Sequence, residues 1–200
     1  MPRSALPVLL IAVFVLFLAS CSGAPKVAVA ADAAAQNASG PISAKPAFWD
    51  AYKSAHSWAH DLVPIAIESK SAAADGKAQV WAATFASPSK HQARIFTYAA
   101  TAQPPDLFKG VNVGRVLNWG GPSAEAMPFF SDDFSVDSEA AYKTALSKAD
   151  PWLKKHPDKP VSLALGNASR FNGPVWYVLW GTQKDGYAVY VSAKTGEVVK

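Results

Sequence analysis

The sequence contains a single cysteine, Cys21, among 200 residues, so no disulfide bond can form within the chain. The folded part must therefore be held together by its apolar core. The sequence also lacks Gly-x-Ser-x-Gly, a phosphate-binding loop, a dinucleotide fingerprint, Cys-x-x-Cys and His-Glu-x-x-His. These absences lead us to expect a protein that is not an enzyme and that has no cofactor.

The basic residues do not cluster, although the formal net charge is +4. Only Lys154 and Lys155 adjoin, and nucleic-acid binding requires a clustered basic face. We therefore expect no nucleic-acid partner.

Residues 22–46 have no aromatic side chain and no apolar periodicity, so that they cannot bury enough surface to order themselves. We expect a flexible tether over residues 21–46.

The N-terminus has the three parts of a secretory signal peptide. Arg3 precedes an apolar run from Ala5 to Ala19, which is too short for an ordinary transmembrane helix, and small residues follow. The ending Leu-Ala-Ser before Cys21 resembles a bacterial lipobox. That resemblance implies removal of residues 1–20 and acylation of Cys21, so that membrane lipid is a partner. Ser22 stands where an aspartate would resemble an inner-membrane retention signal, which favours the periplasmic face of the outer membrane.

The remaining residues contain a weak internal repeat. Ala51-Tyr52-Lys53-Ser54-Ala55 recurs as Ala141-Tyr142-Lys143-Thr144-Ala145, and each string lies in an amphipathic helical pattern. Asp137 or Ser138 can cap the second helix. We expect a first half over residues 47–121, a connector over 122–135 and a second half over 136–200.

An apolar strand and then an aromatic strand pair follow each predicted helix. Trp81 and Trp176 each come after a valine in these strands, and Tyr98 and Tyr190 are the matching aromatics of the next strand. The sequence thus predicts an α+β fold with two similar halves, each a helix packed on a small antiparallel sheet. The candidate core residues are Tyr52, Trp81, Tyr142 and Trp176. The expected strands are residues 63–67, 78–85, 93–99, 161–165, 175–180 and 187–191, with a further candidate over 107–119.

The second half resembles a PepSY domain. The resemblance is carried by the helix start at Ala140–Ala145, by Val175-Trp176-Tyr177-Val178 and by the ending Tyr190–Val198, with its Thr195-Gly196 turn. Ser192 departs from the family, which usually shows an aspartate there. The resemblance implies a domain without catalytic residues that modulates or inhibits a peptidase, or that binds another envelope protein.

Two other kinds of site remain open. His56 and His60 are four residues apart beside Asp61, a spacing that can place two imidazoles on one metal, with His91 or a distant carboxylate as the third ligand. The simpler interpretation is two half-exposed histidines that flank an apolar stripe. Trp119, Trp180 and Tyr187 are candidate contacts for a ligand or partner, since aromatic faces bind apolar molecules and sugars. A small-ligand carrier is therefore the alternative to a protein-binding module, and a metal-dependent hydrolase is a third hypothesis.

Overall fold

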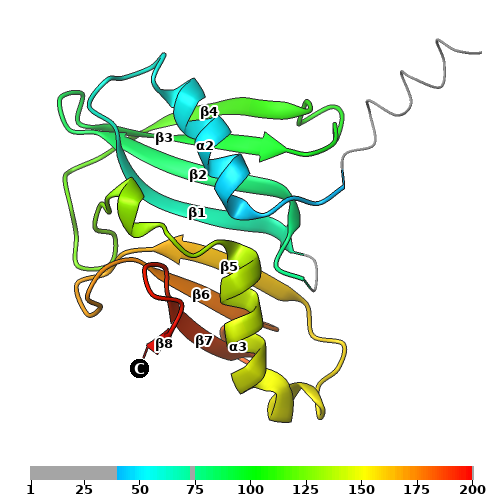
Figure 1. The fold of residues 1–200 in the computed structure, drawn as a ribbon. Helices are drawn as coiled ribbons and strands as arrows, with labels where there is room; N and C mark the ends of the chain where they lie inside the picture. Colours follow the sequence, from blue (N-terminus) through cyan, green and yellow to red (C-terminus); the bar gives the residue numbers. More distant parts are fainter. Residues whose placement is uncertain (1–39, 73–74, 200) are drawn as a thin grey trace, which may run out of the picture. The chain divides into compact units, whose positions relative to one another are not determined.

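The computed structural model describes residues 40–72 and 75–199, and their fold is shown in Figure 1. The expected signal peptide, Cys21 and most of the expected tether lie outside the described residues. Within them, the elements are α2 (Ala44–Ala55), β1 (Val63–Ala72), β2 (Ala78–Ser87), β3 (Gln92–Ala99), β4 (Gly110–Asn118), the 3-10 turn η1 (Ser131–Asp133), α3 (Ser138–Leu153), β5 (Val161–Gly166), β6 (Val175–Trp180), β7 (Tyr187–Ser192) and β8 (Val198–Val199).

The fold is α+β, and its strands form one antiparallel sheet. Among the described residues the sheet has 8 strands in the order β4-β3-β2-β1-β5-β6-β7-β8. The sequence predicts small separate sheets, whereas β1 and β5 pair through Ala66–Gly166, Ile67–Leu165 and Glu68–Ala164. Each strand would otherwise leave unpaired backbone groups at an edge, and this pairing satisfies them.

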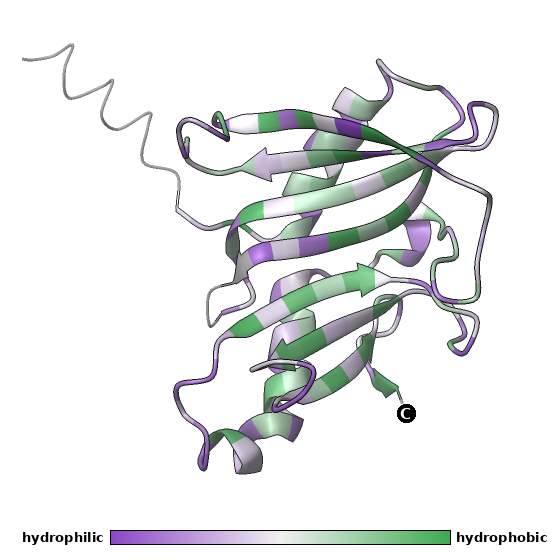
Figure 2. Cartoon of the chain, turned by 180° about the vertical axis from the view of Figure 1, so that it is seen from behind, coloured by the Kyte–Doolittle hydropathy of each residue, from purple (hydrophilic) through white to green (hydrophobic). Residues whose placement is uncertain are grey.

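The helices α2 and α3 cover the same face of this sheet (Figure 1). Alternate residues of a strand point to opposite faces, and in β2 the side chains of Trp81, Ala83 and Phe85 point to the helical side. There the Phe85 ring lies 5.5 Å from that of Phe48 in α2. Viewed from behind, neither α2 nor α3 lies over the sheet (Figure 2). The apolar core therefore lies between the helices and one face of the sheet.

Trp81 and Trp176 lie at the centre of the core, 1% and 0% exposed, with ring centroids 6.4 Å apart. Each indole N–H donates to the carbonyl two residues before a helix. Trp81 bonds the Ile42 oxygen at 2.9 Å and Trp176 bonds the Val136 oxygen at 2.8 Å. These bonds satisfy the polar atom of each buried indole and fix the position where each helix begins.

The N-termini of α2 and α3 are joined through Asp137. Its Oδ1 accepts a hydrogen bond from the Ser138 N–H at 2.7 Å and from the Lys45 N–H of α2 at 2.9 Å. The Ser138 hydroxyl accepts from the Ala44 N–H at 2.9 Å. The first N–H groups of a helix have no partner within it, and here one short segment supplies acceptors to two helices. Asp137 thus acts as the expected cap and also holds α2.

The ordered fold begins before residue 46, the expected end of the tether. Ile42 and Ala78 exchange two backbone hydrogen bonds of 3.1 and 3.0 Å, and α2 begins at Ala44. The expected boundary is therefore wrong. The composition of residues 40–46 resembles a linker, and the groups that order these residues come from distant positions such as Asp137 and Ser138.

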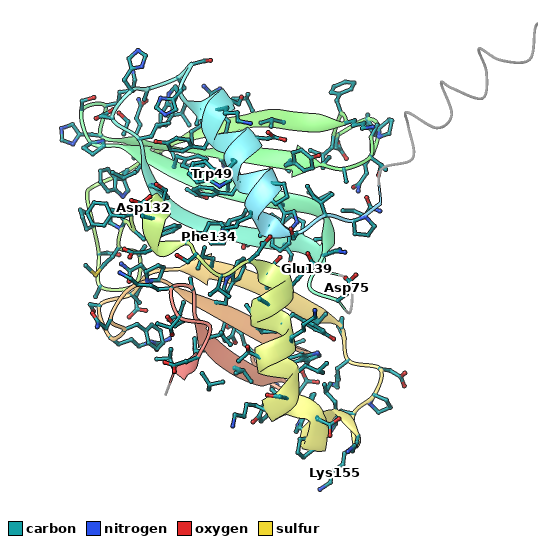
Figure 3. All side chains as sticks on the ribbon, viewed as in Figure 1. Trp49, Asp75, Asp132, Phe134, Glu139 and Lys155 are labelled. Atoms are coloured by element: carbon teal, nitrogen blue, oxygen red, sulfur yellow. The ribbon has the colours of Figure 1, made fainter. Side chains whose placement is uncertain are left out.

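The segment over residues 122–135, which the sequence predicts to be a connector, contributes to the core. Phe129 and Phe134 are 5% and 2% exposed. The ring of Phe134 lies 5.4 Å from that of Phe48 and 5.7 Å from that of Trp176 (Figure 3). Phe134 thus bridges the layer of α2 to strand β6.

The expected match between Tyr98 and Tyr190 is wrong. Tyr98 pairs with Trp81 and points to the helical face, whereas Tyr190 pairs with Tyr177 and points to the uncovered face. The residue opposite Trp176 is Val191. A shift of one residue along a strand moves a side chain to the other face, so this difference changes the role of Tyr190.

Candidate functional site

The uncovered face of the sheet carries a cavity of about 520 Å³ over β5, β6 and β7. Its floor is made of small residues, Ala66 of β1 with Ala164 and Gly166 of β5. Tyr177 and Tyr190 stand beside this floor. The segment from Asn167 to Phe171, together with Glu125 and Gln183, completes the wall. Both the sheet and its connecting segments therefore form the site.

Backbone pairing holds the wall in place. Met127 N–H donates to the Asn167 oxygen at 2.9 Å, and Ser169 N–H donates to the Ala124 oxygen at 2.8 Å. The Asn167 side-chain amide donates to the Pro128 oxygen at 3.1 Å. The segment after β5 is thus tied to the segment before η1, and Arg170 and Phe171 are carried on a supported connection.

Arg170 lies against two aromatic rings. Its guanidinium carbon is 4.8 Å from the centre of the Phe171 ring and 5.3 Å from that of Tyr190. One Nη donates to the Tyr190 hydroxyl at 3.1 Å. These contacts restrict a side chain that is otherwise exposed to solvent, and cation–π attraction adds to them.

The aromatic rings continue across the strands as a row. The Tyr190 ring centre lies 5.0 Å from that of Phe171 and 5.2 Å from that of Tyr177. Burial raises the pKa of Tyr177, and the Tyr190 phenol beside it adds to the shift. Like any tyrosine, Tyr177 is neutral at physiological pH, and its hydroxyl can donate a hydrogen bond.

The structure separates Trp119 from the other two sequence-predicted contact residues, Trp180 and Tyr187, which pair with each other. Trp119 is half-buried just after β4, Trp180 is 3% exposed, and Tyr187 is half-buried opposite it on β7. The Trp180 ring packs 5.8 Å from that of Tyr142, and the Tyr187 ring packs 5.8 Å from that of Trp152 of α3. Trp180 and Tyr187 thus face the helices and contribute to packing, whereas Trp119 follows β4, the strand at the opposite edge of the sheet.

The four core candidates all contact the helical face. Trp81 and Trp176 are almost fully buried, Tyr142 is 8% exposed, and Tyr52 packs partly buried against the same cluster. Tyr52 and Tyr142 come from the recurring strings, yet they occupy different turns, because Tyr52 follows the start of α2 by eight residues and Tyr142 follows the start of α3 by four.

The histidines of the proposed metal site do not gather. The His56 ring packs at 4.6 Å from the Tyr52 ring, while His60 and His91 are exposed. In residues 40–72 and 75–199 no group of three or more His, Cys, Asp or Glu side chains is placed to hold a metal ion. Asp61, the carboxylate beside them, instead accepts hydrogen bonds from the Ser87 hydroxyl at 2.6 Å and the Ser89 N–H at 2.7 Å.

These two bonds predict the titration of Asp61. The Ser87 hydroxyl, and then the Ser89 backbone, lower the pKa of Asp61 from its ordinary 3.8 to about 2. A lowered pKa contributes stability above the ordinary value, and this contribution is lost as the pH falls through about 2. We expect an NMR titration to give a midpoint near 2 and Ser87→Ala to raise it toward 3.8. Ser89→Ala keeps the backbone donor and should raise it less; equal midpoints in all three proteins would contradict this assignment.

The sequence-based reasoning missed Arg170 and Phe171, and it assigned Tyr190 the wrong role. One sequence feature could have pointed to them: Arg170 and Phe171 lie between two predicted strands, in a segment bounded by Gly166 and Gly173. Polar and aromatic residues on a supported connection are common in binding sites. However, the pairing that brings this segment to Tyr190 depends on the sheet register.

Comparisons with known proteins give limited information on this chain. No protein-family model matches it, and no curated protein matches it. Among solved structures, it is similar to a candidate lipoprotein from Clostridium difficile 630, with a TM-score of 0.48 and 11% sequence identity, over 74% of this chain and 86% of that chain. A likeness of this degree carries no argument about function. Within the described residues, neither helix is long and apolar enough to cross a membrane.

Proposed function

We propose that the chain is a lipid-anchored, non-enzymatic binding module of the bacterial cell envelope. Its partner, a peptidase or another envelope protein, binds on the uncovered face of the sheet. The observation that carries this proposal is the one-sided arrangement in Figures 1 and 2, with α2 and α3 on one face and the cavity with its aromatic row on the other. A sheet face without a helix presents a broad surface, and aromatic and arginine side chains are enriched at binding surfaces.

We also infer that the fold consists of two related halves of PepSY type. Each half has a helix followed by strands, and the sheet order runs outward from the central β1–β5 pair in both directions. The indole bonds of Trp81 and Trp176 to the residue two before each helix support this view. Gly196, in the turn that carries the resemblance, has φ of +78°, which suits glycine.

Two matched arginine substitutions test the binding face. Ser162 is exposed on the uncovered face of β5, and Ser147 is exposed on α3. We expect Ser162→Arg to weaken partner binding at least about tenfold, because the long charged side chain obstructs the face, and each tenfold change corresponds to about 1.4 kcal/mol. Ser147→Arg should leave binding unchanged. Partner capture from envelope extracts, with peptidase activity assayed in the captured fraction, gives the measurement. Equal binding by both variants would exclude this face.

The anchor is tested separately through Cys21. We expect mass spectrometry of the wild-type protein to show acylation at Cys21. We expect Cys21→Ser to move the protein out of the membrane fraction, because several acyl chains are needed to hold a protein on a bilayer. An unmodified Cys21 at the mature N-terminus would rule out the lipid anchor without affecting the binding-face proposal.

The cavity favours small-ligand binding as a second candidate function. Its volume of about 520 Å³ falls within the range of about 300–1,000 Å³ typical of small-molecule sites. The residues that would bind are Tyr177, Tyr190, Phe171 and Arg170, not the predicted Trp119, Trp180 and Tyr187.

A further inference from the structure

We propose that the cavity on the uncovered face binds a small monocarboxylate with an apolar body, and that the carboxylate pairs with Arg170. The inference rests on the proposed binding at this face and names the chemistry of the ligand. Its sources are a free organic acid or the C-terminal carboxylate of a peptide, which present the same group.

The Arg170 guanidinium has hydrogen-bond donors that the described residues leave open to a ligand. A guanidinium has five N–H donors, and one of them reaches the Tyr190 hydroxyl. Among the described residues no carboxylate lies within 4.0 Å of the Arg170 nitrogens. The described residues thus supply Arg170 with no counter-ion, and two rings restrict its movement. Such a planar fork matches a carboxylate, with two parallel hydrogen bonds.

The surroundings of Arg170 select an apolar body. Ala66, Ala164 and Gly166 form a floor with no charged atom, and Phe171 and Val175 lie beside it. The Tyr177 ring, which packs 5.2 Å from the Tyr190 ring, offers a flat face at the side. A ligand that places its carboxylate on Arg170 can therefore lay an aromatic or aliphatic group along Tyr177 and the alanines.

The charge of the cavity limits the ligand to one negative charge. Arg170 and Glu125 are the charged side chains that line it, and they form no ion pair within 4.0 Å. Glu125 disfavours a second carboxylate on the ligand. Arg170 is the better-ordered group of the two, because its guanidinium is fixed by Phe171 and Tyr190.

The test compares acids with their amides on the full chain in lipid nanodiscs, with empty nanodiscs as reference. The free-acid probes are phenylpropanoate and phenylpropanamide. The peptide probes are an acetylated tripeptide ending in phenylalanine, with a free or an amidated C-terminus. We expect calorimetry to show at least tenfold tighter binding of the acid in one pair or both. The pair with the tighter acid identifies the source. Equal affinity of acid and amide in both pairs, or no binding by either acid, would overturn the proposal.

Variants assign the interaction to its residues. Arg170→Gln should abolish the preference for the acid, and Arg170→Lys should keep part of it, because the charge remains but the fork is lost. Arg115, an exposed arginine of β4 outside the cavity, provides the matched control, since Arg115→Gln makes the same charge change. Tyr177→Ala should weaken acid and amide alike. Glu125→Gln should leave acid binding unchanged or tighter, and a loss would contradict the charge assignment.

The outcomes remain distinct from those of the binding-face proposal. If Ser162→Arg blocks partner capture while Arg170→Gln keeps the acid preference, the face binds but the carboxylate inference is wrong. If acid binding depends on Arg170 while Ser162→Arg leaves partner capture intact, the ligand site exists without the proposed partner surface.

Discussion

Replacing Trp176 by alanine should remove most of the stability of the protein. The indole is fully buried, its ring contacts those of Trp81 and Phe134, and its N–H satisfies the Val136 oxygen. Large-to-small changes of this kind cost about 3–5 kcal/mol, against about 5–15 kcal/mol for the free energy of unfolding of a whole domain. The Val136 carbonyl also loses its indole partner just before α3. We expect a large fall in the urea midpoint, or a protein that does not fold.

Trp49→Ala is the control for this change. Trp49 lies on α2 with 38% of its surface exposed, so the same atoms are deleted from a site that is partly solvated (Figure 3). Its unfolding midpoint should fall much less. Trp176→Phe keeps a six-membered aromatic ring but loses the pyrrole part of the indole with its N–H, and its stability should lie between those of Trp176→Ala and the wild type. A Trp176→Ala protein with the same midpoint as Trp49→Ala would show that β6 is not central to the core.

The positions of the strands along the chain could be predicted from the local composition of the sequence. Residues 175–180 are predicted as a strand and form β6 over the same bounds, because β-branched and aromatic residues fill the run between Gly173-Pro174 and Gly181. The other predicted strands also appear, each within a few residues of the expected ends. The candidate over residues 107–119 shortens to β4 because Gly110, with φ of +93°, begins the strand.

Pairing between distant strands did not follow from the sequence. The contact of β1 with β5 joins residues about a hundred positions apart, and nothing in the local pattern of either strand specifies the partner. The recurring sequence strings wrongly indicated that Tyr52 and Tyr142 hold equivalent positions. The two tyrosines lie on different turns of their helices. Trp81 and Trp176 share a different feature, because each indole donates a hydrogen bond to the segment before a helix.

The candidate site was harder to predict than the fold for the same reason. Tyr190 reaches the uncovered face through the β6–β7 register, and Arg170 reaches it through the bonds between residues 124–128 and 167–169. Both depend on contacts between segments that are separate in the sequence. Trp180 and Tyr187, the aromatic residues chosen from the sequence, point to the helical face. Their immediate neighbours along each strand point to the uncovered face.

Gly76→Ala should be the second strongly destabilising change. Gly76 has φ of +81°, and an added Cβ would lie 2.7 Å from the Ser138 oxygen and 2.8 Å from the Tyr142 Cβ. The first turn of α3 cannot easily move away, because Asp137 and Ser138 bind both helices there. Lys77 beside it also pairs with Glu139 at 3.1 Å. Left-handed strain of about 1–2 kcal/mol and overpacking of about 1–3 kcal/mol together predict a loss of about 2–5 kcal/mol.

Gly110→Ala separates the two causes of this loss. Gly110 has φ of +93°, and an added Cβ there would have no atom within 4 Å, so only the backbone strain remains. We expect its free energy of unfolding to fall by about 1–2 kcal/mol, and that of Gly76→Ala to fall further by the overpacking term. Urea unfolding of both variants gives the comparison. Equal losses would mean that the connection before β2 is free to move away from α3, and that this contact adds nothing to the stability provided by the β1–β5 pairing and the buried aromatic rings.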